Sequence, residues 1–179
     1  ELLDIAKKSV DTAVRGHKKY EIGSARSARL TQERGAFVTL KKRGQLRGCI
    51  GYVAPVEPLA EVVRDVAAFA ALRDQRFPPV TPAELPELTY EISVLSPLHR
   101  VLNTNQIRVG THGLVVRREA NEGLLLPQVA PEQGWERQAF LENTCLKAGL
   151  PASAWKDPAT DIFSFTALVF GDHVAGAAR

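Results

Sequence analysis

Cysteines and metal-ligand patterns are scarce in this chain. Its 179 residues include only two cysteines, Cys49 and Cys145, which are too few for a disulfide framework, and spacing alone does not decide whether they pair. Neither belongs to a C-x-x-C or C-x-x-H pattern, and the four histidines are dispersed. The sequence therefore gives no positive signal for a metal site, and it leaves the cofactor, if there is one, unknown.

Long apolar runs are also missing. No stretch approaches the roughly 20 residues that span a bilayer, and the first residues lack the charged-then-apolar layout of a signal peptide. The chain contains no methionine, so we expect its initiating residue to precede Glu1. The hydrophobic (45%) and charged (24%) fractions are those of an ordinary globular protein. We therefore predict a cytoplasmic protein with no membrane partner.

The net charge is unevenly distributed. Residues 1–60 hold 12 Lys/Arg against 6 Asp/Glu, whereas the remainder holds 11 against 14. A basic first third is one signature of nucleic-acid binding. However, the stretch carries no recognised nucleic-acid motif and no set of stacking aromatics, which favours a solvated face. The basic positions in question are Arg26, Arg29, Arg34, Lys41, Lys42 and Arg43.

Apolar periodicity predicts a mixture of helices and hairpins. Steps of three and four residues predict helices over 2–15, from Pro58 to about 70, and from 135 to Gly149, with a short capped turn after Thr81. The proline-rich stretch 74–80 is predicted to be non-helical. Runs rich in β-formers predict strands over 35–40, 46–53, 89–95, 107–118, 123–129 and 162–170, with hairpins joining the first pair and the fourth to the fifth.

The stretch Gly44–Gly51 combines a cysteine with an arginine two residues before it. Side chains at i and i+2 of a strand share a face, so Arg47 and Cys49 are predicted to emerge together while Leu46 and Ile50 point into a core. A neighbouring guanidinium lowers the pKa of a thiol, and the thiolate is the nucleophile. This pattern predicts a reactive cysteine.

An alternative interpretation of the same stretch is a buried, inert Cys49. Free cysteine is among the most buried residue types. Gly48 and Gly51 leave the backbone bare on either side of the sulfur, which suits close approach by a ligand but equally by another chain segment. Spacing alone leaves both interpretations open.

Three more polar residues are candidates for a site. Glu91 alternates with apolar neighbours in its strand, so it faces outward or lines a cleft. His112 opens the apolar part of the second hairpin, and Gln128 follows a proline that favours an edge or a bulge. An exposed carboxylate is the simpler interpretation of Glu91.

Several ordered motifs resemble those of the AMMECR domain family, whose prokaryotic members are called AmmeMemoRadiSam system protein A. The similarity covers nearly the whole chain. Its most specific part is the six-residue signature Leu46-Arg47-Gly48-Cys49-Ile50-Gly51. The other motifs are Asp74, Arg76-Phe77-Pro78-Pro79-Val80, Glu91–Leu95, Gly110–Leu114, Gly123–Val129, Gly134-Trp135, Phe140-Leu141 and Cys145–Leu150.

The resemblance implies an α+β fold, with an antiparallel sheet flanked by helices and a smaller lobe forming a cleft. It implies one domain over residues 1–179, whose larger lobe contains both termini. Prokaryotic relatives occur beside, or fused to, a Memo-type protein and a radical S-adenosylmethionine protein, which are therefore expected partners. The family's biochemical activity is not settled, so the resemblance names no reaction.

Two functional hypotheses follow for the expected cleft. In a thiol-dependent enzyme, Cys49 is the nucleophile, His112 the general base, and Glu91 orients the histidine or binds a substrate amine. Arg47 and Gln128 then bind the substrate or its oxyanion. In a binding module, Arg47 and backbone amides near Gly48 and Gly51 hold a small anionic ligand or the end of a partner protein. The sequence leaves open whether the protein is an enzyme.

Overall fold

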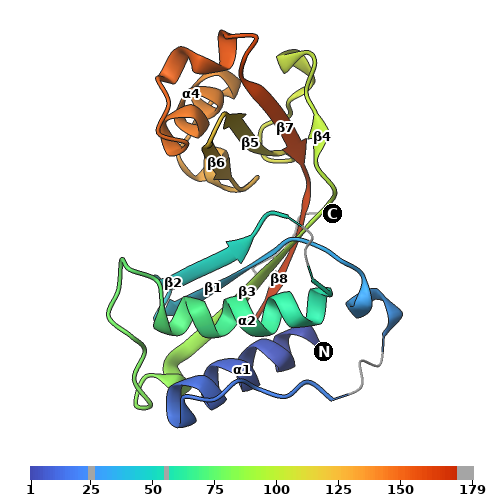
Figure 1. Cartoon of the computed structure of the whole chain (residues 1–179). Helices are drawn as coiled ribbons and strands as arrows, with labels where there is room; N and C mark the ends of the chain where they lie inside the picture. Colours follow the sequence, from blue (N-terminus) through green and yellow to red (C-terminus); the bar gives the residue numbers. More distant parts are fainter. Residues whose placement is uncertain (24–26, 55–56, 173–179) are drawn as a thin grey trace. The chain divides into compact units, whose positions relative to one another are not determined.

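The computed structural model describes residues 1–23, 27–54 and 57–172. The chain forms two compact units (Figure 1). The first unit comprises Glu1–Leu95 and the chain from Leu168 onward, and the second comprises Ser96–Ala167. Each unit has its own four-stranded antiparallel sheet, so the α+β prediction is confirmed.

The sheet of the first unit has the strand order β2-β1-β3-β8. Its strands are β1 (Ala36–Lys42), β2 (Gln45–Tyr52), β3 (Leu88–Leu95) and β8 (Ala167–Gly171). β1 pairs antiparallel with both β2 and β3, so it is an inner strand, and β2 lies at an edge. The first hairpin is therefore as predicted.

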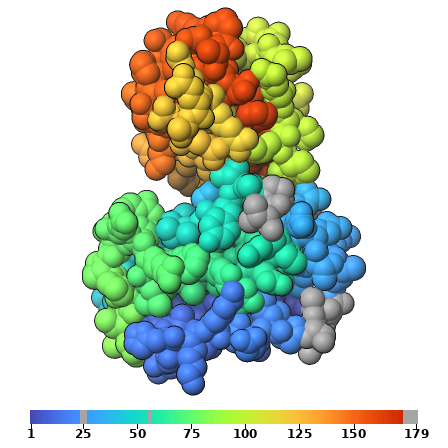
Figure 2. Space-filling view, in the orientation of Figure 1, coloured from blue at the N-terminus to red at the C-terminus, as the bar shows by residue number. Residues whose placement is uncertain are grey.

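Two helices cover one face of this sheet. α1 (Leu2–Gly16) and α2 (Leu59–Leu72) lie side by side, with α2 against β1 and β2 and α1 against β3. Figure 2 shows α1 in blue next to α2 in blue-green at the surface of the unit. Each helix buries most of the apolar stripe that its periodicity predicted, although Leu3 of α1 and Phe69 of α2 are only partly buried. Short 3₁₀ helices occupy Ala28–Thr31 and Leu85–Glu87.

The turn after Thr81 differs slightly from the prediction. The Thr81 amide donates to the Glu84 carboxylate at 3.0 Å, as a capping box requires. However, the helix that follows is only the 3₁₀ turn Leu85–Glu87, and the backbone is already extended at Leu88, where β3 begins.

A β-bulge interrupts the β1–β2 ladder. Leu40 pairs with Gly48 and Lys41 with Leu46, so Arg47 is an extra residue with no partner across the ladder. The bulge shifts the alternation of side chains on β2. Leu46 is consequently 42% exposed, and the prediction that it points into the core was wrong. Ile50, on the other side of the bulge, packs against the core as predicted.

The sheet of the second unit has the order β4-β7-β5-β6. Its strands are β4 (His99–Arg100), β5 (Gly113–Arg118), β6 (Asn121–Leu125) and β7 (Asp161–Phe165). Its helices are α3 (Val129–Glu132), α4 (Arg137–Lys147) and the 3₁₀ turns Thr104–Gln106 and Ala152–Lys156. Cys145, on α4, is fully buried in the core of this unit, as its spacing indicated.

Two strand predictions need correction. The second hairpin is shorter than predicted at its open end, because β5 begins at Gly113 rather than at residue 107, and β6 ends at Leu125, with Pro127 in the turn that follows. The single strand predicted over 162–170 is two strands, β7 and β8, which belong to different sheets. Periodicity does not reveal this break, because both halves are apolar. No helix among the described residues has both the length and the apolar character needed to cross a membrane.

Candidate functional site

Cys49 belongs to a row of side chains across three strands. Thr39 on β1 pairs with Cys49 on β2 and with Glu91 on β3. Residues directly opposite each other in a ladder project from the same face. The flanking residues Val38 and Leu40 are fully buried in the core beneath the helices, so the row lies on the sheet face opposite α1 and α2.

The members of this row interact with one another. The Thr39 hydroxyl contacts the Cys49 Sγ at 3.3 Å. Lys41 Nζ, one pleat farther along β1, pairs with Glu91 Oε2 at 3.0 Å. The site therefore combines a hydroxyl, a thiol, a carboxylate and an ammonium group on one face. The Lys41 side chain is 39% exposed and that of Glu91 19%, so both remain accessible.

The backbone of Cys49 is hydrogen-bonded by an ion pair, Asp74 and Arg76, from the segment after α2. Asp74 Oδ2 accepts the Cys49 N–H at 2.8 Å, and Arg76 Nη2 donates to the Cys49 carbonyl at 3.3 Å. Asp74 and Arg76 are themselves paired at 2.6 and 2.9 Å. The Arg76 side chain and these hydrogen bonds hold the pKa of the Asp74 carboxyl at about 2.

Arg47 does not lie beside the thiol. Its Nε and Nη2 donate to the two carboxylate oxygens of Glu84 at 3.0 and 3.1 Å, and its Nη1 donates to the Pro78 carbonyl at 2.9 Å. The bulge at Arg47 turns its side chain out of the alternation that would have placed it with Cys49. Arg47 therefore anchors the segment 78–84 to β2 through a two-pronged ion pair.

The thiol of Cys49 is not activated by its surroundings. Burial raises the pKa of Cys49 above its ordinary value, and the Asp74 and Glu91 charges act in the same direction. The Thr39 hydrogen bond and the Arg76 charge lower it, but burial is the larger effect. The guanidinium that favours the thiolate is therefore that of Arg76 rather than Arg47, and burial outweighs its effect, so the pKa of Cys49 is raised and not lowered as predicted.

Both glycines of the signature are required by close packing. A Cβ on Gly48 would lie 2.1 Å from the Ala70 carbonyl oxygen, so Gly48 is where α2 approaches β2. A Cβ on Gly51 would lie 2.2 Å from the Phe37 ring, which covers this glycine from β1. The missing side chains at these two glycines therefore allow α2 and the Phe37 ring to pack closely against β2, and they leave no open space for a ligand there.

The two remaining candidates lie in the second unit. The His112 Nδ1 accepts the Arg108 N–H at 3.2 Å. The Gln128 Oε1 is shielded from solvent and has no hydrogen-bond partner among the described residues. Both residues flank the end of the β5–β6 hairpin at which Leu114 pairs with Leu125. A thiol–imidazole pair between Cys49 and His112 remains a prediction.

The basic residues around the first hairpin are largely neutralised. Three of them form ion pairs with glutamates of the same unit, at 3.0, 3.1 and 2.7 Å: Lys41 with Glu91, Lys42 with Glu84, and Arg43 with Glu87. Arg26 lies outside the described residues. Within the described ranges, no group of three or more His, Cys, Asp or Glu side chains is arranged to hold a metal ion.

Comparison with known proteins identifies the family. The AMMECR1 family model matches residues 3–170. The chain belongs to the AMMECR1 family. It is 45% identical to a protein of Methanothermobacter thermautotrophicus, over 94% of this chain and 91% of that protein. It is 40% identical to NEQ441 of Nanoarchaeum equitans, over 94% and 97%.

A solved crystal structure shares the fold of this AMMECR1-family chain. The chain superposes on the crystal structure of PH0010, an uncharacterized protein from Pyrococcus horikoshii, with a TM-score of 0.92. The two are 37% identical, and the match covers 96% of this chain and 90% of that one.

Sequence reasoning missed several residues around Cys49 in this AMMECR1-family chain. Thr39 is one position of the strand predicted over 35–40, and Glu84 lies in the turn predicted after Thr81, and neither position predicts a role near Cys49. Asp74 and Arg76 were recognised only as members of a motif, without a role. Their one sequence signal was their position in a proline-rich segment, which has to find hydrogen-bond partners outside a helix or a ladder.

Proposed function

We propose that this AMMECR1-family protein is a non-catalytic binding module, and that a small anionic ligand contacts the row formed by Thr39, Cys49, Glu91 and Lys41. The observation that supports the proposal is that the surroundings of the Cys49 thiol do not activate it as a nucleophile. Burial raises its pKa, and the arginine of the signature is committed to Glu84. A protonated thiol is a weak nucleophile, but it fills space and donates a weak hydrogen bond.

The ligand's negative charge would be met by Lys41. Its ammonium group has three donors and uses one of them on Glu91. Glu91 would accept from a hydroxyl or amine on the ligand, and the Thr39 oxygen would also accept, because its O–H is donated to the Cys49 sulfur and its lone pairs are free. This arrangement suits a small ligand that carries both an acidic group and a hydrogen-bond donor.

Within the second unit, His112 offers a hydrogen-bond donor and Gln128 an acceptor. Because the His112 Nδ1 accepts a backbone N–H, the neutral ring carries its proton on Nε2. That nitrogen donates a hydrogen bond and has no free lone pair with which to take a proton. Gln128 offers a side-chain amide whose oxygen accepts no hydrogen bond from any of the described residues. These roles fit binding better than general-base catalysis.

The Memo-type and radical S-adenosylmethionine proteins suggested by the resemblance are the proposed partners of this module. In that arrangement the chain supplies a binding surface and the chemistry belongs to the partner. A thiol-dependent enzyme is the competing function, and nucleic-acid binding is disfavoured by the ion pairs of the first hairpin.

The test is the rate of alkylation of Cys49 by iodoacetamide as a function of pH, followed by peptide mass spectrometry. The expected midpoint lies above 9.0, the ordinary value from which burial raises the pKa of this thiol. The buried thiol of Cys145 is measured in the same sample as a matched comparison. A Cys49 midpoint below about 7.5 would mean a thiolate stabilised at neutral pH, and the proposal would give way to the enzyme.

Two arginine variants make the test specific. Arg76→Gln should raise the midpoint of Cys49, because the positive charge of Arg76 is the one that favours the thiolate. Arg47→Gln should leave the midpoint unchanged, since Arg47 contacts Glu84 instead. The opposite pattern would mean that Arg47, not Arg76, controls the thiol, and would contradict the proposed role of the signature.

A further inference from the structure

A cavity lies between the C-terminal halves of α1 and α2. Its volume is ≈ 490 Å³, which is within the range of small-molecule sites. Its apolar lining comes from Ala13 of α1 and from Ala68, Phe69 and Leu72 of α2. The two helices cover the sheet face opposite the Cys49 row, so this cavity is separate from the site proposed above.

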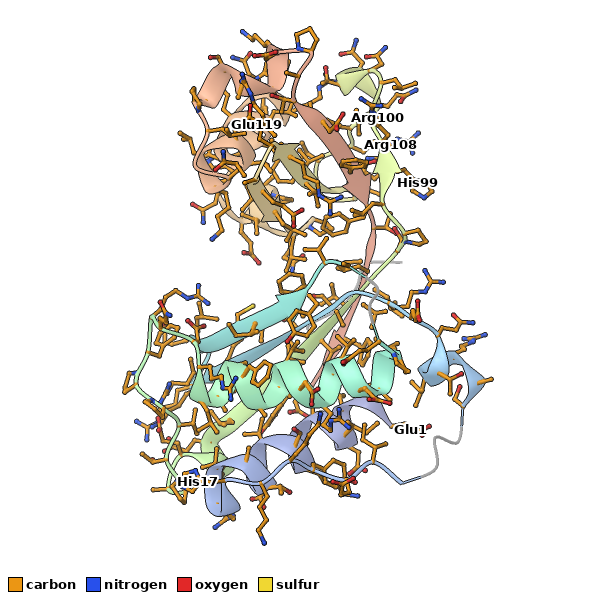
Figure 3. The ribbon with its side chains drawn as sticks, viewed as in Figure 1. Glu1, His17, His99, Arg100, Arg108 and Glu119 are labelled. Atoms are coloured by element: carbon orange, nitrogen blue, oxygen red, sulfur yellow. The ribbon has the colours of Figure 1, made fainter. Side chains whose placement is uncertain are left out.

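The rim of this cavity is strongly basic. Four residues with cationic or ionisable nitrogen groups line it: His17, Lys18, Lys19 and Arg73. Figure 3 labels His17 at the end of α1, where the rim begins. The one acidic lining residue, Asp65, is occupied by Lys19 at 3.1 Å and Arg64 at 2.7 Å. The lining residues of the cavity therefore include no further carboxylate that could neutralise its remaining positive charges.

Arg73 is oriented but not paired. Its guanidinium lies 4.5 Å from the centroid of the Phe69 ring, which fixes the group by a cation–π contact. In the described part of the chain, neither Arg73 nor Lys18 has an ion-pair or side-chain hydrogen-bond partner. A guanidinium stacked on a ring keeps its N–H edges free, and these edges match the two oxygens of a carboxylate.

We propose that this cavity binds a small amphipathic carboxylate. The apolar body of the ligand would pack on Ala13, Ala68 and Leu72, and its carboxylate would form a two-pronged ion pair with Arg73. Lys18 would add a second positive charge at the mouth. The alternative is that these cations only compensate the negative C-terminal ends of the two helices, which needs no ligand.

The experiment is a titration of the whole chain, labelled with ¹⁵N, with 2-naphthoate, followed by amide chemical shifts. We expect saturable shift changes centred on Ala13, Ala68 and Leu72. The uncharged 2-naphthamide has the same ring system without the carboxylate, and it should bind about tenfold more weakly. Arg73→Gln should weaken naphthoate binding by a similar factor.

Two further variants distinguish binding of the carboxylate in the cavity from nonspecific electrostatic attraction of naphthoate to a basic surface. Arg15→Gln removes one positive charge from an exposed arginine of α1 that pairs with Asp11 and does not line the cavity, so it should leave the affinity unchanged. Ala68→Phe fills the cavity without changing the charge and should abolish binding. The proposal is overturned if naphthoate gives no localised shifts, if the amide binds equally well, or if Arg73→Gln and Arg15→Gln behave alike.

Discussion

Asp74→Asn tests the clamp that holds Cys49 in place. Asp74 is 7% exposed, and its two oxygens accept from the Cys49 N–H, the Arg76 N–H and the Arg76 guanidinium. An asparagine keeps one acceptor oxygen and replaces the other with an NH₂ group. That group would face the same donors, so at least one hydrogen bond is lost and the charge of Arg76 is left uncompensated.

The magnitude follows from the pKa of Asp74. A carboxyl whose pKa falls from 3.8 in the unfolded chain to about 2 in the folded one stabilises the fold by about 2.5 kcal/mol at pH 7. Because the folded pKa is depressed, this stabilisation is complete above the unfolded pKa and is lost as the pH falls through the folded one. It should be about 1.3 kcal/mol at pH 3 and near zero at pH 1.

The assay is urea denaturation at pH 7 and pH 3, followed by far-ultraviolet circular dichroism, to which α1 and α2 of the first unit contribute strongly. Tryptophan fluorescence follows the second unit separately, because Trp135 and Trp155 both lie in it. Asp74→Asn should lower the free energy of unfolding by about 2.5 kcal/mol at pH 7, and the difference should roughly halve at pH 3.

Asp11→Asn is the matched control. Asp11 pairs with an arginine on the exposed surface of α1, so its loss should change the free energy of unfolding by less than about 0.5 kcal/mol at either pH. The reasoning is refuted if Asp74→Asn behaves like this control at pH 7, or if its effect is the same at pH 3 as at pH 7.

Two further substitutions test the packing of the signature. Gly48→Ala should lower the free energy of unfolding by about 3 kcal/mol, because the new Cβ meets the Ala70 carbonyl oxygen at 2.1 Å; Gly23→Ala, with nothing within 4 Å, should cost less than about 0.5 kcal/mol. Glu84→Gln should lower the free energy of unfolding by about 2 kcal/mol in urea denaturation, since it leaves the half-buried Arg47 without its carboxylate partner. Glu87→Gln, at a more exposed pair, should cost under about 1 kcal/mol, and equal costs for the two would contradict the anchoring role.

The helices and the first hairpin could be predicted from the sequence, because each is determined by the pattern of apolar and polar residues within its own segment. α1 and α2 were predicted nearly to the residue from their apolar stripes. The first hairpin was predicted as well, since its strands are rich in β-formers on both sides of a polar turn. The burial of Cys145 followed from its spacing on a helix face.

The environment of Cys49 could not be predicted, because it is built by residues distant in the chain. The bulge at Arg47 is stabilised by Glu84, which lies 37 positions away. The clamp on the Cys49 backbone comes from Asp74, 25 positions away. An alternation rule assumes an uninterrupted ladder, so one extra residue in β2 was enough to separate Arg47 from Cys49. The direction of the Cys49 pKa shift is set mainly by burial, which the local pattern did not reveal.

The clamp on Cys49 has a consequence for self-association. β2 is an edge strand, and such strands offer free N–H and C=O groups to any extended chain that meets them. Asp74 accepts the Cys49 N–H and Arg76 donates to its C=O, which are the two hydrogen bonds that a neighbouring strand would otherwise make. The Asp74 and Arg76 side chains therefore make the hydrogen bonds that a fifth strand would make at Cys49, so this residue has no free edge groups with which to pair with a second copy of the sheet.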